Sequence, residues 1–121
     1  MSNSVISINE EGARARYFVS GTDVFVMGHY QGNPIFPGVL ILDMLMDLAQ
    51  ALGRHRYGEA SVSRIKRVQY LHASVPGDVL DLSASIKTQD EAGLQIVASA
   101  ASGGTVRARA TLECRPEAPH A

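Results

Sequence analysis

The stretch from Val39 to Arg54 constrains the fold more than any other part of the chain. Its polar residues follow one another at spacings of four, three and four, so on a helix they occupy a single narrow stripe. They are Asp43, Asp47, Gln50 and Arg54. Nearly all the other positions are apolar. A helix with so wide an apolar surface must be covered on most sides, so the sequence predicts a core helix rather than a surface helix.

Segments with the two-residue period of β-strands flank this helix on both sides. Residues 5–19 alternate around the polar turn Asn9–Gly12, which predicts a β-hairpin. After Gly58 the same period predicts strands over 63–73, 80–86, 94–100 and 106–114. Pro76-Gly77-Asp78 ends the first of these, and the turns at 90–93 and 102–104 are short, so the last three strands are expected to be antiparallel neighbours.

Together these elements predict one α+β domain over residues 1–121, in which an antiparallel sheet wraps around one long central helix. Residues 115–121 are expected to form a flexible tail. Small residues dominate the predicted inner face of the sheet and would let the helix lie close to the strands; they are Ala84, Ala98, Ala100, Ala108 and Ala110. One helix cannot cover every strand of a six-strand sheet, which predicts a second subunit.

Charge, cysteine content and hydrophobicity exclude several classes of protein. In the 121 residues, 11 Lys and Arg stand against 12 Asp and Glu, so general electrostatic binding to nucleic acid is not expected. The single cysteine, Cys114, can form neither an internal disulfide nor a thiolate metal cluster. We see no signal peptide and no apolar run of the ~20 residues that a membrane span needs. A cytoplasmic protein is therefore expected.

The loop over residues 28–38 concentrates features that an active site uses. It holds a histidine, three glycines and two prolines, and it leads into the predicted helix at Pro37. Taken alone, His29 fits a solvated loop residue better than a catalytic one. Asp43 and Asp47 likewise fit the wet stripe of an amphipathic helix, where Asp43 would be favoured near the positive end of the helix dipole.

The string GHYQGNPIFPGVLILD, Gly28 to Asp43, changes this interpretation. It resembles the active-site motif of the hot-dog-fold 3-hydroxyacyl-[acyl-carrier-protein] dehydratases, in which an acidic residue follows the histidine by fourteen positions and a Pro-Gly pair precedes the helix. A second block, IKRVQYLHASVPGD from Ile65 to Asp78, resembles the strand of that family that ends in Pro-Gly-Asp. The resemblance runs from about Tyr17 to Glu113 and implies the hot-dog fold.

The resemblance also implies a role for each matched residue. His29 would take the proton from the α-carbon of a 3-hydroxyacyl thioester, and Asp43 would protonate the departing hydroxyl. The Gly38 amide would bind the thioester oxygen, and the Ile35 carbonyl would hold the other ring nitrogen of His29. The implied product is a trans-2-enoyl thioester, carried on the phosphopantetheine arm of acyl carrier protein, with no metal or redox cofactor.

The family pattern further implies that the histidine and the acid of one site come from different subunits. A homodimer is expected, and a heterodimer stays open. Several apolar residues are candidates for lining an acyl tunnel, with core or interface packing as the alternative for each: Phe25, Tyr30, Phe36, Met44 and Met46. A basic cluster is a candidate dock for the acidic carrier protein, or else solvated surface: Arg54, Arg56, Arg64, Lys66 and Arg67.

Two positions depart from the family pattern, and a third distinguishes between two branches of the family. The acid is Asp43, as in the branch that also isomerises a trans-2 double bond to cis-3, which does not by itself establish isomerase activity. Asp47 replaces a glutamine that usually orients the acid, and Gln31 replaces a proline. Repulsion between carboxylates one turn apart would push Asp43 toward its protonated form or leave Asp47 pointing to solvent.

Two other functions remain open on the sequence alone. One is a hot-dog acyl thioesterase, which would hydrolyse the same kind of thioester. The other is a non-catalytic subunit of a heterodimeric dehydratase. The acyl chain length also stays open, as does the pathway, which would be fatty acid synthesis or the synthesis of a polyene or another polyketide.

Overall fold

A computed structural model describes residues 4–20 and 36–117. The elements in chain order are β1 (Ser4–Ile8), β2 (Gly12–Phe18), α2 (Gly38–Tyr57), β3 (Ala60–Tyr70), β4 (Val79–Asp90), β5 (Gly93–Ser102) and β6 (Thr105–Pro116). Five residues that the sequence analysis singled out lie outside these ranges and are not described: Phe25, His29, Tyr30, Gln31 and Ile35.

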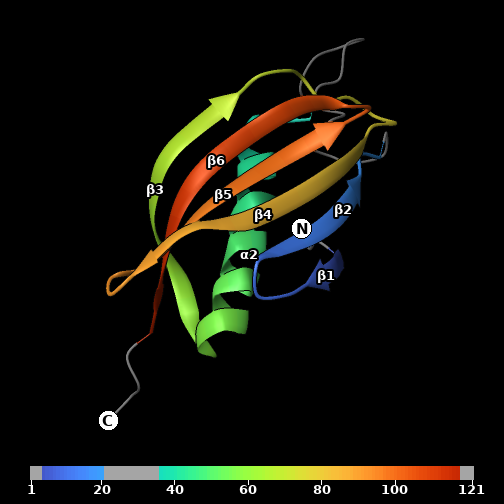
Figure 1. Ribbon diagram of the computed structural model, residues 1–121. Coiled ribbons are helices and arrows are strands. Elements are labelled where there is room, and N and C mark those ends of the chain that lie inside the picture. Colours follow the sequence, from blue (N-terminus) through green and yellow to red (C-terminus); the bar gives the residue numbers. More distant parts are fainter. Residues whose placement is uncertain (1–3, 21–35, 118–121) are drawn as a thin grey trace.

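The strands form one six-stranded sheet in the order β1-β2-β4-β5-β6-β3, and every neighbouring pair is antiparallel. Figure 1 shows the sheet curving around α2, with the β1–β2 hairpin on one side and β3 on the other. Two consecutive glycines, Gly103 and Gly104, join β5 to β6 with positive φ angles, as a tight two-residue hairpin turn requires. The predicted α+β architecture is confirmed.

The core lies between the concave face of the sheet and α2. Alternate residues of the strands point inward, and the five predicted inward alanines are all buried. From the helix, Ile41, Leu45, Leu48 and Leu52 complete this core. The small alanine side chains let α2 lie against the sheet, which confirms the predicted close packing.

The polar stripe of α2 faces away from the sheet. Asp43, Asp47 and Arg54 are exposed, and Gln50 is half-buried. Val39 lies on the same stripe, four residues before Asp43, and is 64% exposed. The helix is therefore a core helix on its sheet side, whereas Val39, Asp43 and Asp47 are exposed on its other side.

The ends of several elements differ from the prediction. Pro37 is the residue before the helix, which continues to Tyr57. β3 begins and ends three residues earlier than expected, because the amides of both Leu71 and His72 donate to the Arg107 carbonyl instead of continuing the strand. β6 includes Arg115 and Pro116, which were assigned to the tail, because they pair with the start of β3.

Among the helices of residues 4–20 and 36–117, none is both long enough and apolar enough to cross a membrane.

Candidate active site

The start of α2 presents a backbone amide that is suited to bind an anion or a polarised oxygen. Phe36 enters the helix through a bridge to Ser74, whose carbonyl accepts a 2.7 Å hydrogen bond from the Phe36 amide. Pro37 follows in an extended conformation, and proline has no side-chain acceptor that could cap the helix. The amide of Gly38 is one of the first four helical amides, which lack intrahelical partners, and it lies at the positive end of the helix dipole.

The ring of Tyr70 covers Gly38 from the end of β3. A Cβ atom at residue 38 would lie 2.7 Å from Cδ1 and 2.8 Å from Cε1 of this ring, so a side chain there would displace the tyrosine. Tyr70 itself is 54% exposed and so forms an accessible wall beside the helix start. Sequence periodicity marked Tyr70 only as a strand residue, because the contact depends on how β3 and α2 meet.

Asp43 lies in the second turn of the helix, about 7.5 Å along the axis from Gly38 at 1.5 Å per residue. Its carboxylate is exposed. Asp47 follows one turn later. Partial burial, and then the neighbouring Asp43 carboxylate, raise the pKa of Asp47 above its ordinary value of 3.8. The expected repulsion therefore acts on the second carboxylate.

This pKa shift predicts that Asp47 destabilises the folded protein to an extent that depends on pH. Because its folded pKa is raised, the folded protein binds more protons than the unfolded chain, and stability is lost as the pH rises above 3.8. Asp47→Asn removes this loss. At pH 7 we expect a melting temperature about 1–2 °C higher than that of the wild type, the size of a like-charge pair on an exposed helix face. Calorimetry at pH 3 should give equal melting temperatures, and a gap that persisted there would contradict the assignment.

The described tunnel candidates pack in the core of the chain. Phe36 and Met44 are each 1% exposed, and the Phe36 ring lies 5.6 Å from that of Tyr17 between ring centroids. Met46 is half-buried against the core. Within one chain, Phe36 and Met44 therefore have the core role that the sequence left open beside the tunnel.

The five residues of the predicted basic cluster divide into two groups. Arg54 and Arg56 lie in the last turn of α2, about 24 and 27 Å along the axis from Gly38 at 1.5 Å per residue. Arg56 is also held in place, because its guanidinium donates to the Gln89 side chain and to the Glu10 carbonyl, at 2.7 Å each.

The other three lie on β3, which leads from the far end of α2 toward Tyr70. They are Arg64, Lys66 and Arg67, and all are exposed. Arg67 is about 10 Å along the strand from Tyr70 at 3.3 Å per residue. Arg109 on β6, which the sequence analysis did not single out, is exposed opposite Gln69 and adds a cation beside this group. The pairing of β3 with β6 brings it there, which a linear search for basic clusters does not detect.

The described part of the chain contains neither a candidate metal site nor a reactive thiol. Its residues include no group of three or more His, Cys, Asp or Glu side chains that could hold a metal ion. Cys114 is a free thiol, buried beneath α2, and burial raises its pKa. A neutral thiol in the core is a packing residue rather than a nucleophile.

Comparison with protein families identifies the chain. Residues 5–106 match the model of the ApeI-like family, described as ApeI dehydratase. The chain is also 30% identical over 111 residues to a FabZ 3-hydroxyacyl-[acyl-carrier-protein] dehydratase from Pseudothermotoga lettingae, a match that covers 89% of this chain and 79% of that protein. The chain belongs to the ApeI-like dehydratase family and is an enzyme of the lyase class.

Solved structures confirm the hot-dog fold. A chain of the dehydratase heterocomplex ApeI:P from Xenorhabdus doucetiae superimposes with a TM-score of 0.73 at 21% identity, covering 95% of this chain and 99% of that one. A hypothetical thioesterase from Streptococcus pneumoniae, solved with coenzyme A, gives a TM-score of 0.82 at 11% identity, covering 99% and 92%. At these identities the likeness supports the fold alone.

Proposed function

We propose that this protein removes water from a 3-hydroxyacyl thioester carried on acyl carrier protein and forms a trans-2-enoyl thioester. The observation that carries the proposal is the start of α2: a helix-terminal amide at Gly38, beside an accessible tyrosine ring, with a carboxylate at Asp43. We assign the amide to binding the thioester oxygen and the Asp43 carboxyl group, in its protonated form, to protonating the leaving hydroxyl; membership of a dehydratase family supports this assignment.

In the proposed reaction, His29 takes the proton from carbon 2, and negative charge develops on the thioester oxygen, where the Gly38 amide stabilises it. The electron pair then forms the double bond between carbons 2 and 3, while the bond from carbon 3 to the hydroxyl oxygen breaks. Asp43 gives its proton to that hydroxyl, which leaves as water. Return of the proton from His29 to Asp43 through solvent resets the site. No electrons are gained or lost overall, so the proposed reaction requires no redox cofactor.

The proposed site needs a second subunit. Asp43 and Val39 are uncovered on the outer stripe of α2, and a carboxylate that works as an acid needs a drier environment. β3 lies at one edge of the sheet and exposes Ile65 and Tyr70, which are 42% and 54% accessible. We assign these surfaces to a homodimer in which His29 of one subunit acts with Asp43 of the other.

For the carrier protein, the cations on β3 and β6 are the better dock. Arg67 and Arg109 lie at the Tyr70 end of these strands, whereas Arg54 and Arg56 lie near the opposite end of α2 from Gly38. A dock near Tyr70 shortens the path of the phosphopantetheine arm to the Gly38 amide. A cytoplasmic reaction belongs to the same proposal, in agreement with the free cysteine at position 114.

A heterodimer is the second candidate assembly. The ApeI:P structure is a dehydratase heterocomplex, and this chain resembles one chain of it over nearly its whole length. In such an assembly the partner would supply one of the two catalytic groups at each site. A thioesterase is disfavoured for two reasons. Hydrolysis of the thioester needs no proton donor at the β-hydroxyl, and the matched family is one of dehydratases.

The test is a dehydration assay on the purified protein. We expect a 3-hydroxyacyl-carrier-protein series of several chain lengths to give a conjugated enoyl product, detected by mass spectrometry or absorbance. His29→Ala should lower the rate about 100- to 10,000-fold, as loss of a general base does, without loss of the assembly measured by light scattering. Release of free acid instead would indicate a thioesterase. Activity that appeared only with a second dehydratase chain would indicate the heterodimer.

A further inference from the structure

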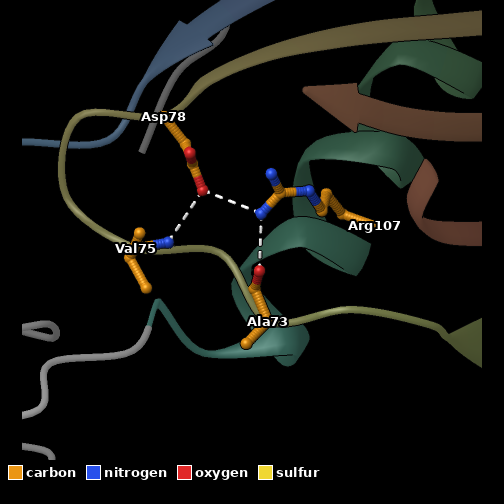
Figure 2. Close-up of polar contacts among 4 residues, drawn as sticks. All are labelled: Ala73, Val75, Asp78 and Arg107. Carbon is orange, nitrogen blue, oxygen red and sulfur yellow. Dashed lines mark hydrogen bonds and ion pairs between the residues drawn. The ribbon is translucent and has the colours of Figure 1, made fainter. Parts of the chain in front are cut away.

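One arginine anchors the whole connection between β3 and β4. Figure 2 shows the Arg107 guanidinium, from β6, reaching into this connection. Its Nη1 donates to the Ala73 carbonyl at 2.5 Å and to Asp78 Oδ2 at 2.9 Å. The same Asp78 oxygen accepts from the Val75 amide at 2.9 Å. The Arg107 carbonyl in turn accepts from the amides of residues 71 and 72, at 2.8 and 3.2 Å.

The anchored segment, residues 71–78, contains a turn with few stabilising contacts among its own residues. Its tight end is the bend Val75–Asp78, in which Pro76 precedes Gly77 with a φ of 96° and the Asp78 amide donates to the Val75 carbonyl at 3.1 Å. This is a type II arrangement, which requires a residue free to adopt positive φ at the third position. Val75 is 40% exposed, so its side chain adds little apolar packing to the turn.

This segment holds the start of α2. Ser74 accepts the hydrogen bond from the Phe36 amide, two residues before Gly38. Tyr70, whose ring covers Gly38, immediately precedes the segment. The segment also holds the end of β2, because the Val19 amide donates to the Asp78 carbonyl at 2.9 Å and the Val19 carbonyl accepts from Gly77 at 2.8 Å. These two contacts at and next to Gly38 thus involve residues adjoining or within the anchored turn.

The ion pair between Arg107 and Asp78 is largely shielded from solvent. The side chains of Arg107 and Asp78 are only 16% and 18% exposed, so water screens their attraction less than that of a surface pair. By contrast, the pair between Arg16 and Asp81 has similar geometry, at 3.0 Å, but its side chains are 60% and 50% exposed. A pair of that kind contributes little.

Resting on the proposed function, we infer that Arg107 is a positioning residue for the thioester-binding amide of Gly38. Through Asp78 and the 71–78 turn it fixes Phe36 and Tyr70 and thereby sets where the helix begins. A displacement of about 1 Å at a reacting group can lower a rate about 100-fold. Loss of the anchor should therefore lower kcat much more than it raises KM.

Three variants test this role. Arg107→Met removes both contacts of Nη1 and should lower kcat about 10- to 100-fold, with KM changed by less than about 3-fold. Arg107→Lys should recover most of the lost activity, because a single nitrogen makes both contacts and an ammonium group can replace it. Asp78→Asn keeps the shape of the turn and weakens the pair, so it should give an intermediate kcat and serves if Arg107→Met folds poorly. Rates are compared per folded dimer, well below the lowest melting temperature.

Arg16→Met is the matched control, since it breaks an arginine–aspartate pair on the same sheet whose two residues lie outside the 71–78 turn. It should keep kcat within about 2-fold of the wild type. Hydrogen exchange gives a readout independent of the reaction: in Arg107→Met, peptides covering 36–40 should exchange about 10-fold faster, with no change in Arg16→Met. Equal exchange and equal kcat in the two methionine variants would overturn the inference. If the wild type does not dehydrate any substrate, the proposed function fails, and the exchange result alone then decides whether Arg107 positions the helix start.

Discussion

Replacing Asp43 with asparagine should lower the kcat of dehydration about 100- to 10,000-fold and leave the fold intact. Asparagine has almost the shape of aspartate but cannot give a proton to the departing hydroxyl, so the loss measures general acid catalysis. The side chain is exposed on the outer stripe of α2 and makes no contribution to the core, so the melting temperature should change by less than about 2 °C. Steady-state kinetics and calorimetry on the same preparation separate the two effects.

Asp81→Asn is the matched control for this change. It makes the same carboxylate-to-amide replacement at an exposed position on β4, where the side chain pairs with Arg16. The kcat of this variant should stay within about 2-fold of the wild type. If Asp43→Asn retained a tenth or more of the wild-type kcat, Asp43 would not be the acid.

Mixing the two inactive variants tests the shared site. If His29 of one subunit acts with Asp43 of its partner, a dimer of one His29→Ala subunit and one Asp43→Asn subunit contains one intact site and one doubly damaged site. Random exchange makes about half the dimers of this mixed kind, so the mixture should regain about a quarter of wild-type activity. No recovery after exchange, verified by mass spectrometry of the mixed dimers, would place both groups in one subunit.

Much of the fold was predictable from local patterns. The two-residue period identified the strands, because each has one face on the core and one on solvent, and the apolar breadth of 39–54 identified the helix. The ends of β3 and β6 were not predictable, since they depend on which amides find partners across the sheet. Leu71 and His72 leave the strand for the Arg107 carbonyl, while Arg115 and Pro116 gain partners at the start of β3.

The site divides in the same way. The motif that contains Gly38 and Asp43 is contiguous, so the sequence could assign both residues a role. Three other residues act at separations of about 30 residues or more. Tyr70 reaches the helix start, Arg107 reaches the turn, and Arg109 joins the basic group. Only strand pairing and the packing of α2 bring them there. Nothing in the alternation of β6 distinguishes Arg107 from the other outward-facing residues of that strand. Contiguous chemistry is visible in one sequence, whereas the supports that position it are not.

The packing of α2 on β6 gives the second large prediction, at Gly53. A Cβ atom at this buried position would lie 2.3 Å from Cys114 Sγ and 3.2 Å from the Ala60 Cβ. Alanine favours a helix by about 1 kcal/mol over glycine, but forcing an extra methyl into a filled core costs about 1–3 kcal/mol. Helix and strand also cannot separate freely here, because Cys114 and Ala60 are each 1% exposed and enclosed. We therefore expect Gly53→Ala to lower the melting temperature by several degrees.

Cys114→Ala in the same chain should reverse most of that loss. It removes the sulfur that would be in contact at 2.3 Å and leaves the Cys114 Cβ at 3.6 Å, an ordinary van der Waals distance. Cys114→Ala alone should destabilise the protein by creating a small cavity, so the double variant should be more stable than the sum of the single effects predicts. Denaturant unfolding of the four proteins at one protomer concentration measures this coupling. Additive effects would mean that the helix moves away from β6 instead of colliding with Cys114.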